Sequence, residues 1–261
     1  MNHHEFTFPF GEMLLPQDPK IISQREVLIL GAYPSSFHIR WKPPAPFMGI
    51  KAIAVDNEPS VFWDGSDEQD IFNAWLDNIS WQSDWGDASP AGKYNGSSGV
   101  WINNNLLAPL GISRENVWFT DCLDIYYCSN GLKKRIQDTY NPFAKQFKLP
   151  LAKLPPHPGE NKIVRLAMKH HEERIKQQIK IAQPDQVITL GNAALRFLSS
   201  LISSGSETPK KLSPSPEHYG KVFGNLEIDN TKFSLLPIAH PAAPQKYQEA
   251  HKLWIENTKA K

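Results

Sequence analysis

Short apolar runs that end at turn-forming residues recur along the chain. Residues 27–30 are four consecutive apolar residues stopped by Gly31, and residues 117–121 and 186–190 are also short and mostly apolar. Such runs are typical of strands buried on both faces of a parallel sheet. A rigid turn is expected after the first strand, because Gly31 can adopt backbone angles closed to other residues and Pro34 fixes its own φ.

Apolar residues at helical spacing occur between these strands. The spacing and the flanking turn residues predict helices over residues 67–79, 99–110, 162–182, 191–203 and 245–257. Further strands are predicted over residues 49–56, 221–228 and 232–238, the last two paired across Asp229-Asn230. Alternating strands and helices indicate an α/β fold, a three-layer αβα sandwich around a mostly parallel central sheet.

The remaining segments are rich in proline and polar residues. We expect an extended N-terminal arm over residues 1–24, loops over 36–48, 80–98 and 204–219, and an irregular Pro-rich insertion over 129–160. The chain has no internal repeat and no linker between two separate cores. We therefore expect residues 1–261 to form a single domain.

Composition narrows the function classes. A chain of 261 residues with 40% hydrophobic and 21% charged residues is an ordinary globular protein. The net charge of +1 means that any nucleic-acid binding must come from a local patch. Cys122 and Cys128 are too few for a Cys-only zinc site or an iron–sulfur cluster, and they fit a reducing compartment. We expect no metal and no cofactor.

Targeting signals are also missing from the sequence. No run approaches the roughly 20 apolar residues of a membrane span. The N-terminus lacks the basic start and apolar middle of a secretory signal peptide. We therefore expect a cytoplasmic protein with no membrane partner, and we take a monomer as the starting assumption.

Polar residues gather where the predicted strands end. In a parallel sheet these ends share one edge, where ligands bind. The residues expected at this edge are Ala32, Tyr33, Ser35, Asp56, Thr120, Asp121, Gly191, Asn192 and His240. Two carboxylates and a histidine could form an active site. Equally, the aspartates could cap loops and the histidine could be a core residue. No dinucleotide fingerprint, phosphate loop or nucleophile elbow is present.

Five segments follow one another in an informative order. They are Leu30-Gly31-Ala32-Tyr33-Pro34-Ser35; Gly96-Ser97-Ser98-Gly99 with Leu110-Gly111-Ile112; Val117-Trp118-Phe119-Thr120-Asp121; Pro184-Asp185-Gln186-Val187-Ile188-Thr189-Leu190-Gly191-Asn192-Ala193-Ala194; and His240-Pro241-Ala242. Together they resemble the motifs of the uracil-DNA glycosylase superfamily. The resemblance runs from about residue 25 to residue 255.

The resemblance implies a pocket that takes a flipped base from single- or double-stranded DNA and cleaves its N-glycosidic bond. It implies that His240 is catalytic, stabilising the negative charge on the departing base. It also implies that the backbone of Pro241 and Ala242 contacts phosphate. The residues implied to bind the base are Gly31, Ala32, Tyr33, Pro34, Ser35 and Asp121.

Three positions depart from the family pattern. Members commonly carry Asp, Asn or Glu at one of the positions of Ala32 and Tyr33, so we expect Asp56 to hold the catalytic water, or no cleavage. Asp121 stands where members often place Asn; an ionised carboxylate only accepts hydrogen bonds, whereas a protonated one mimics an amide in part. Ser35 replaces a crowding Tyr of the uracil-specific branch, which would admit larger or modified bases.

These observations leave more than one hypothesis. The first is a base-excision glycosylase for a damaged or modified base, not strictly uracil. The alternative is a divergent member that binds nucleic acid or a nucleobase without excision, with Arg40, Trp41 and Lys42 supplying phosphate and stacking contacts. The run Lys133-Lys134-Arg135 could add phosphate contacts or be ordinary solvated surface. A weaker third hypothesis is a small-molecule hydrolase.

Overall fold

A computed structural model describes residues 5–17, 19, 23–205 and 207–259. The chain divides into two compact units, each assembled from three separate segments. Unit 1 comprises Met1–Gln17, Pro34–Val100 and Ile125–His157, and unit 2 comprises Asp18–Tyr33, Trp101–Asp124 and Pro158–Lys261. Each unit is described by itself, and the single domain expected over residues 1–261 stays a prediction.

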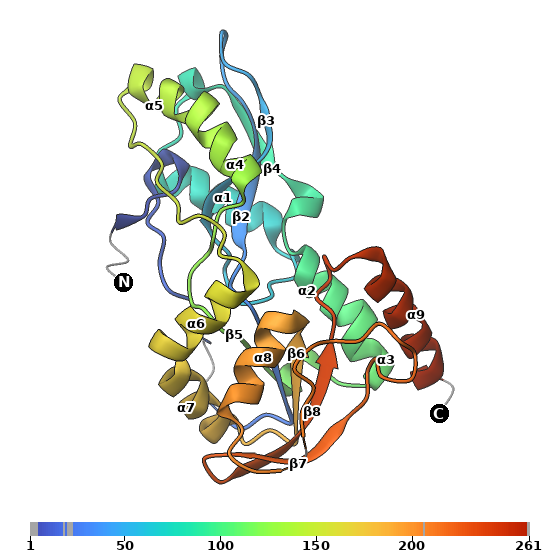
Figure 1. Ribbon diagram of the computed structural model, residues 1–261. Helices are drawn as coiled ribbons and strands as arrows, with labels where there is room; N and C mark the ends of the chain where they lie inside the picture. The colour runs from blue at the N-terminus through green and yellow to red at the C-terminus, as the bar shows by residue number, and fades with distance from the viewer. Residues whose placement is uncertain (1–4, 18, 20–22, 206, 260–261) are drawn as a thin grey trace. The chain divides into compact units, whose positions relative to one another are not determined.

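Unit 2 contains a five-stranded sheet with the order β5-β1-β6-β8-β7 (Figure 1). Its strands are β1 (Val27–Gly31), β5 (Val117–Asp121), β6 (Gln186–Leu190), β7 (Phe223–Ile228) and β8 (Thr231–Ile238). All neighbours are parallel except β7, which pairs antiparallel with β8 at the edge. β1 is buried along its whole length, as expected for a continuous apolar run in the middle of a parallel sheet.

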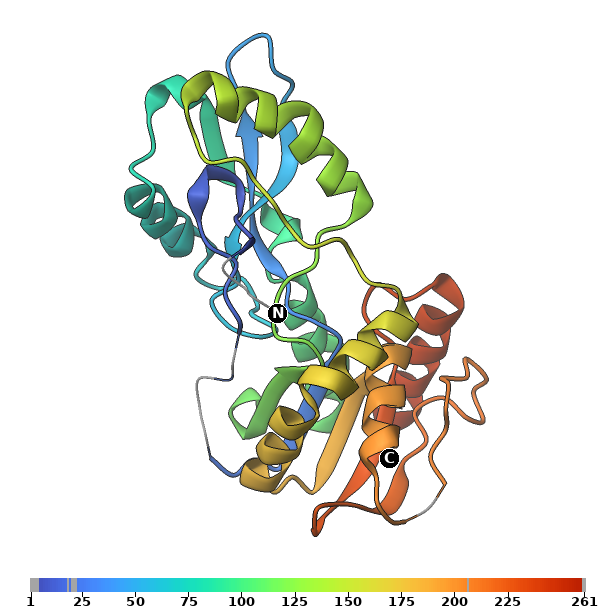
Figure 2. The ribbon, with the colours of Figure 1, turned by 60° about the vertical axis from the view of Figure 1, so that its left-hand side comes forward.

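Helices cover both faces of this sheet. On one face lie α6 (Glu160–His170), α7 (Glu172–Ala182) and α8 (Gly191–Leu201), and on the other lie α9 (Gln245–Lys259) and α3 (Ala108–Leu110) (Figures 1 and 2). α3 continues from α2 (Ser97–Ile102) through a π-helical turn (Asn103–Leu107). The single helix expected over residues 162–182 is broken at His171 into α6 and α7. The three-layer α/β fold class is confirmed.

Unit 1 contains a three-stranded antiparallel sheet with the order β3-β2-β4. Its strands are β2 (Ser36–Lys42), β3 (Ile50–Asn57) and β4 (Asp87–Pro90). The loop expected over residues 36–48 was therefore wrong over β2, and the loop expected over residues 80–98 was wrong over β4. The strand expected over residues 49–56 exists, but it pairs with β2 and is no part of the central sheet.

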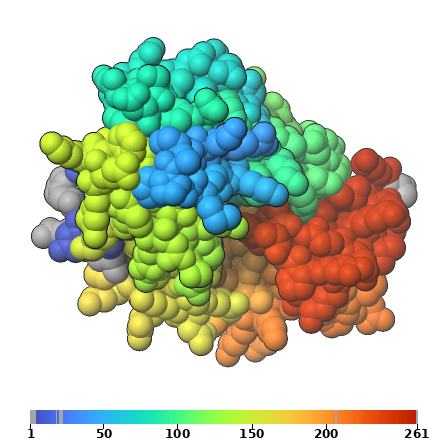
Figure 3. All heavy atoms as spheres, turned by 90° about the horizontal axis from the view of Figure 1, so that it is seen from above, coloured from blue at the N-terminus to red at the C-terminus, as the bar shows by residue number. Residues whose placement is uncertain are grey.

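The helices of unit 1 fall partly where an irregular insertion was expected. α1 (Glu68–Asn78) confirms the predicted helix. α4 (Asn130–Arg135), a π-helical turn (Ile136–Tyr140) and α5 (Asn141–Phe147) occupy much of residues 129–160, so that segment is not irregular throughout. Phe143 of α5 packs on Trp41 of β2 with a ring separation of 4.8 Å, and these segments adjoin on one surface (Figure 3, yellow-green beside blue).

An aromatic cluster forms the core of unit 1. The ring of Phe10 contacts those of Trp41, Trp75, Trp81, Trp85 and Tyr140. Of the arm expected over residues 1–24, residues 1–4, 18 and 20–22 lie outside the described residues. Phe10 shows that the described part packs into a core. Short 3-10 turns are Pro9–Gly11, Ser83–Trp85, Gly92–Tyr94 and Arg114–Asn116.

Candidate functional site

The carboxyl ends of the four parallel strands of unit 2 bring several predicted residues to one edge. Asp121 ends β5, Tyr33 follows β1, Gly191 follows β6 and His240 follows β8. Asp121 and His240 stand on strands three positions apart, roughly 14 Å between backbones at about 4.8 Å per strand.

Asp121 is held beside the end of β1 by backbone pairing. Asp121 is in register with Gly31, and Cys122 N donates to Gly31 O at 3.0 Å. The residue is only 3% exposed, and its Oδ1 accepts no hydrogen bond from the described residues. Burial raises the pKa of the Asp121 carboxyl to about 7, against the opposing effect of the Arg174 charge. Both protonation states are therefore accessible near neutral pH.

Arg174 of α7 fixes the backbone at this strand end. Its Nη2 donates to the carbonyl oxygens of Asp121 at 2.7 Å and Cys122 at 3.2 Å, and its Nη1 donates to Thr120 Oγ1 at 3.2 Å. Thr120 Oγ1 in turn donates to Gln178 Oε1 at 2.7 Å. Sequence reasoning missed this pair. A signal was present, since Arg174 and Gln178 are four residues apart beside the apolar stripe of the helix.

Tyr33 supplies a protonated hydroxyl near the carboxyl group. Burial, and secondarily the charge of Asp121, raise the pKa of Tyr33 to about 12. The phenol therefore remains a potential hydrogen-bond donor over the whole physiological range.

His240 is oriented by its own loop. The backbone N–H of Ala242 donates to His240 Nδ1 at 3.1 Å. Burial lowers the pKa of His240. In the neutral ring an accepting Nδ1 requires the proton on Nε2, which makes Nε2–H a donor. Gly191, at φ +86°, passes close by, so that a Cβ there would lie 3.5 Å from His240 Cβ.

A second mostly buried pair lies in the segment after β5. His171 Nε2 is 3.6 Å from Asp124 Oδ1, and the two side chains are 14% and 13% exposed. His171 is also the residue that separates α6 from α7. Sequence reasoning did not identify this pair, because Asp124 and His171 are far apart in the chain and no pattern links them.

Three other predicted site residues, Asp56, Pro34 and Ser35, belong to unit 1. Grouping Asp56 with the central sheet was wrong, because β3 pairs antiparallel with β2 in a different sheet. Asp56 Oδ1 accepts from Asn57 N at 2.7 Å, and burial raises the pKa of its carboxyl to about 6.

The residues of β2 predicted to contact nucleic acid point to opposite sides of the strand, one side buried and the other exposed. Trp41 is 0% exposed, and its Nε1 donates to Trp85 O at 2.8 Å. Its ring belongs to the core of unit 1, so the predicted stacking role was wrong. Arg40 and Lys42 alternate with Trp41 and are exposed, so both remain candidates for phosphate contacts.

The described residues offer neither a metal site nor a membrane-spanning helix. Nowhere in that part of the chain do three His, Cys, Asp or Glu side chains come together in a group that could hold a metal ion. No described helix combines the length and apolarity that crossing a membrane requires.

Comparison with known proteins agrees with the fold. A family model described as the uracil DNA glycosylase superfamily matches residues 23–258. The matched range includes every strand of the central sheet and most of α9. A search of curated proteins found no match.

Proposed function

Because the chain belongs to the uracil DNA glycosylase superfamily, we propose that it excises a damaged or modified base, not strictly uracil, from DNA by hydrolysing the N-glycosidic bond. Membership supports a DNA glycosylase-like function at the family level, with DNA as the substrate. The observation that carries the finer proposal is the chemistry of one strand edge, where a neutral histidine donor follows β8 and a buried carboxyl group, whose Oδ1 accepts no hydrogen bond from the described residues, ends β5.

His240 is the proposed catalytic group. As the glycosidic bond breaks, negative charge grows on the departing base, and Nε2–H donates to the base oxygen that carries it. A fixed donor in a buried site stabilises this charge more strongly in the transition state than in the ground state. The backbone of Pro241 and Ala242 is proposed to contact phosphate, which positions the strand without reading its sequence.

Asp121 is the proposed reader of the base edge, with Tyr33 as a neighbouring donor. Ionised, Asp121 accepts hydrogen bonds only and favours an edge with N–H donors. Protonated, it offers one donor and one acceptor, as an amide does. We expect the ratio of excision rates between these two kinds of base to change with pH around 7, where the pKa of the Asp121 carboxyl lies.

The lack of a water-activating side chain at Ala32 and Tyr33 favours a second candidate function. Ala32 and Tyr33 offer no carboxylate or amide where superfamily members commonly carry one. We propose that Asp56 holds the water, and Asp56→Asn should then slow excision without weakening DNA binding. If no group holds water, the chain binds nucleic acid or a nucleobase without excision.

The decisive experiment is a base-release assay over deaminated and alkylated bases in single- and double-stranded DNA. We expect release of at least one base, and a loss of about 10²–10³-fold in rate for His240→Ala. His170→Ala is the matched control, because His170 is exposed on α6 and should leave the rate unchanged. Salt-dependent DNA binding without release of any base, while a control glycosylase works, would establish the second function instead.

A further inference from the structure

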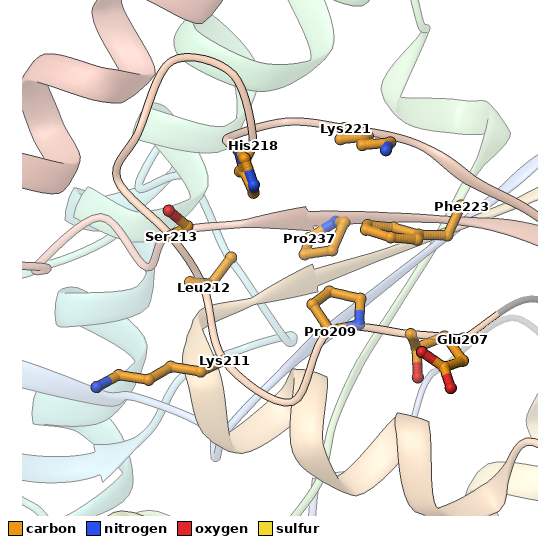
Figure 4. A pocket seen from close by; sticks show the side chains of 10 residues that line it. Glu207, Pro209, Lys211, Leu212, Ser213, His218, Lys221, Phe223 and Pro237 are labelled. Atoms are coloured by element: carbon orange, nitrogen blue, oxygen red, sulfur yellow. The ribbon is translucent and has the colours of Figure 1, made fainter.

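A pocket of about 280 Å³ lies in unit 2 beside the edge of the central sheet (Figure 4). The loop between α8 and β7 closes it against Phe223 of β7 and Pro237 of β8. Its apolar walls also include Pro209 and Leu212, while Lys221 brings a positive charge to it and His218 an imidazole ring. Neither Asp121 nor His240 lines this pocket, so it is separate from the proposed catalytic edge.

Hydrogen bonds to three other elements hold the loop in place. Leu212 N donates to Asn192 Oδ1 of α8 at 2.8 Å, and Leu212 O accepts from Tyr247 Oη of α9 at 3.2 Å. At its start the loop pairs with β7, where Ser203 N donates to Glu227 O at 2.9 Å. A wall anchored at several points favours a pocket that exists before a ligand binds.

The side chains define the chemistry of a ligand. Figure 4 shows the Phe223 ring, seen edge-on, beside the Pro237 ring, with His218 above them and Pro209 below. Lys221 Nζ lies over the Phe223 ring, 5.9 Å from its centre, so a positive charge stands beside the aromatic wall of the pocket. Glu207 lies on the Phe223 side and can accept from a ring N–H group.

We propose that this pocket binds a nucleotide, with the base against Phe223 and Pro237 and the phosphate at Lys221 and His218. Its volume of about 280 Å³ lies just below the usual range of roughly 300–1,000 Å³, which suits one ring system with a short anionic group. Aromatic stacking contributes about 1–3 kcal/mol per base and tolerates any base. Choosing a nucleotide over another aromatic anion rests on the proposed function.

The nucleotide has two possible sources. Pro237 is three residues before His240, about 10 Å along an extended chain. A DNA strand engaged at His240 therefore has neighbouring nucleotides within reach of the pocket. A free mononucleotide has the same chemistry, and the two sources are separated by testing both.

The experiment is calorimetric titration of the full chain with undamaged deoxynucleoside monophosphates and, separately, with undamaged single-stranded pentanucleotides. We expect Lys221→Glu and Phe223→Ala to weaken binding about tenfold, the loss of one charged hydrogen bond or one stacked ring. Lys169→Glu, which makes the same charge change on exposed α6, is the control. Thermal unfolding of each variant identifies any loss caused by misfolding, and Lys221→Glu changes only an exposed side chain.

The proposal is supported if either ligand binds the wild type and Lys221→Glu weakens that binding while Lys169→Glu does not. Binding of monophosphates identifies a free nucleotide, and binding of pentanucleotides alone identifies a DNA strand. Equal effects of the two substitutions on both ligands, or no binding of either ligand by the wild type, would overturn it. Because the ligands are undamaged, the pocket is tested separately from excision. If a base is released but Lys221→Glu and Phe223→Ala bind the ligands as the wild type does, only the pocket proposal is refuted. If the two substitutions weaken binding but no base is released, only the glycosylase proposal is refuted.

Discussion

Burial acts in the same direction on the acid and the base of the proposed site. It raises the pKa of Asp121 to about 7 and lowers the pKa of His240, and in both cases the uncharged form gains. Tyr33 is likewise held in its neutral form. A site lined by neutral donors and acceptors suits an uncharged base, and its electrostatic effect is then largest when charge develops during bond cleavage.

Asp121 should also make stability depend on pH. The pKa of the Asp121 carboxyl is higher in the folded than in the unfolded protein. The folded protein therefore loses stability as the pH rises from about 4 to about 7, because ionisation of this carboxyl costs more in the folded state. Asp121→Asn removes this cost. We expect the variant to gain stability relative to wild type on going from pH 4 to pH 8, by an amount on the order of 4 kcal/mol at most.

Urea unfolding of both proteins at several pH values measures this difference. Asp77→Asn, which neutralises an exposed carboxylate on α1, is the control. A gap between Asp121→Asn and wild type that stays constant from pH 4 to pH 8 would contradict a raised pKa in the folded protein.

At the scale of elements, the strands that could be predicted from sequence are those whose own residues are mostly apolar, as expected for buried strands. β1, β5 and β6 are short apolar runs, so they needed no knowledge of their partners. β3 is also a mostly apolar run, yet it pairs antiparallel with β2. The sequence of a single strand does not determine which strand it pairs with. The misplacement of Asp56 followed directly from this.

Two other elements were missed although their patterns were present. β2 alternates strictly, with Phe37, Ile39 and Trp41 buried, but the prolines that follow it favoured a loop. The helical segment from α4 to α5 buries Ile136 and Tyr140 four residues apart, but Pro142 obscured the period. Proline at the first turn of a helix is tolerated, since its missing N–H has no partner there.

The turn between β6 and α8 gives a test of local geometry. Gly191 adopts φ +86°, a conformation that costs a residue with a side chain about 1–2 kcal/mol. Gly191→Ala should lower the free energy of unfolding by that amount, and its methyl group, 3.5 Å from His240 Cβ, should also restrict the histidine. Gly131→Ala in α4 is the matched control, because nothing lies within 4 Å and alanine favours a helix by up to about 1 kcal/mol. Equal changes in urea unfolding for the two variants would count against a strained turn.

At the scale of the whole chain, two of the junctions between the units follow strands that carry proposed site residues. The second segment of unit 1 begins at Pro34, shortly after β1, and its third segment begins at Ile125, shortly after β5. Both connections therefore leave the carboxyl ends of strands that carry site residues. The sequence pattern did not reveal this organisation, because no linker or change in composition marks either junction.

The near-zero net charge makes DNA affinity depend on a few cations, and this can be measured. If Arg40 and Lys42, both exposed on β2, each contact a phosphate, replacing either by Ala should reduce the slope of log K against log salt by about 0.9 for duplex or 0.7 for single-stranded DNA. The loss should be the same for all DNA sequences, since phosphate contacts carry no base information. Lys169→Ala on α6 should leave the slope unchanged. If the β2 variants behave like this control, β2 supplies no phosphate contact, and the counterion release must arise from other cations, of which Lys133, Lys134 and Arg135 in unit 1 and Lys221 in unit 2 are the next to test.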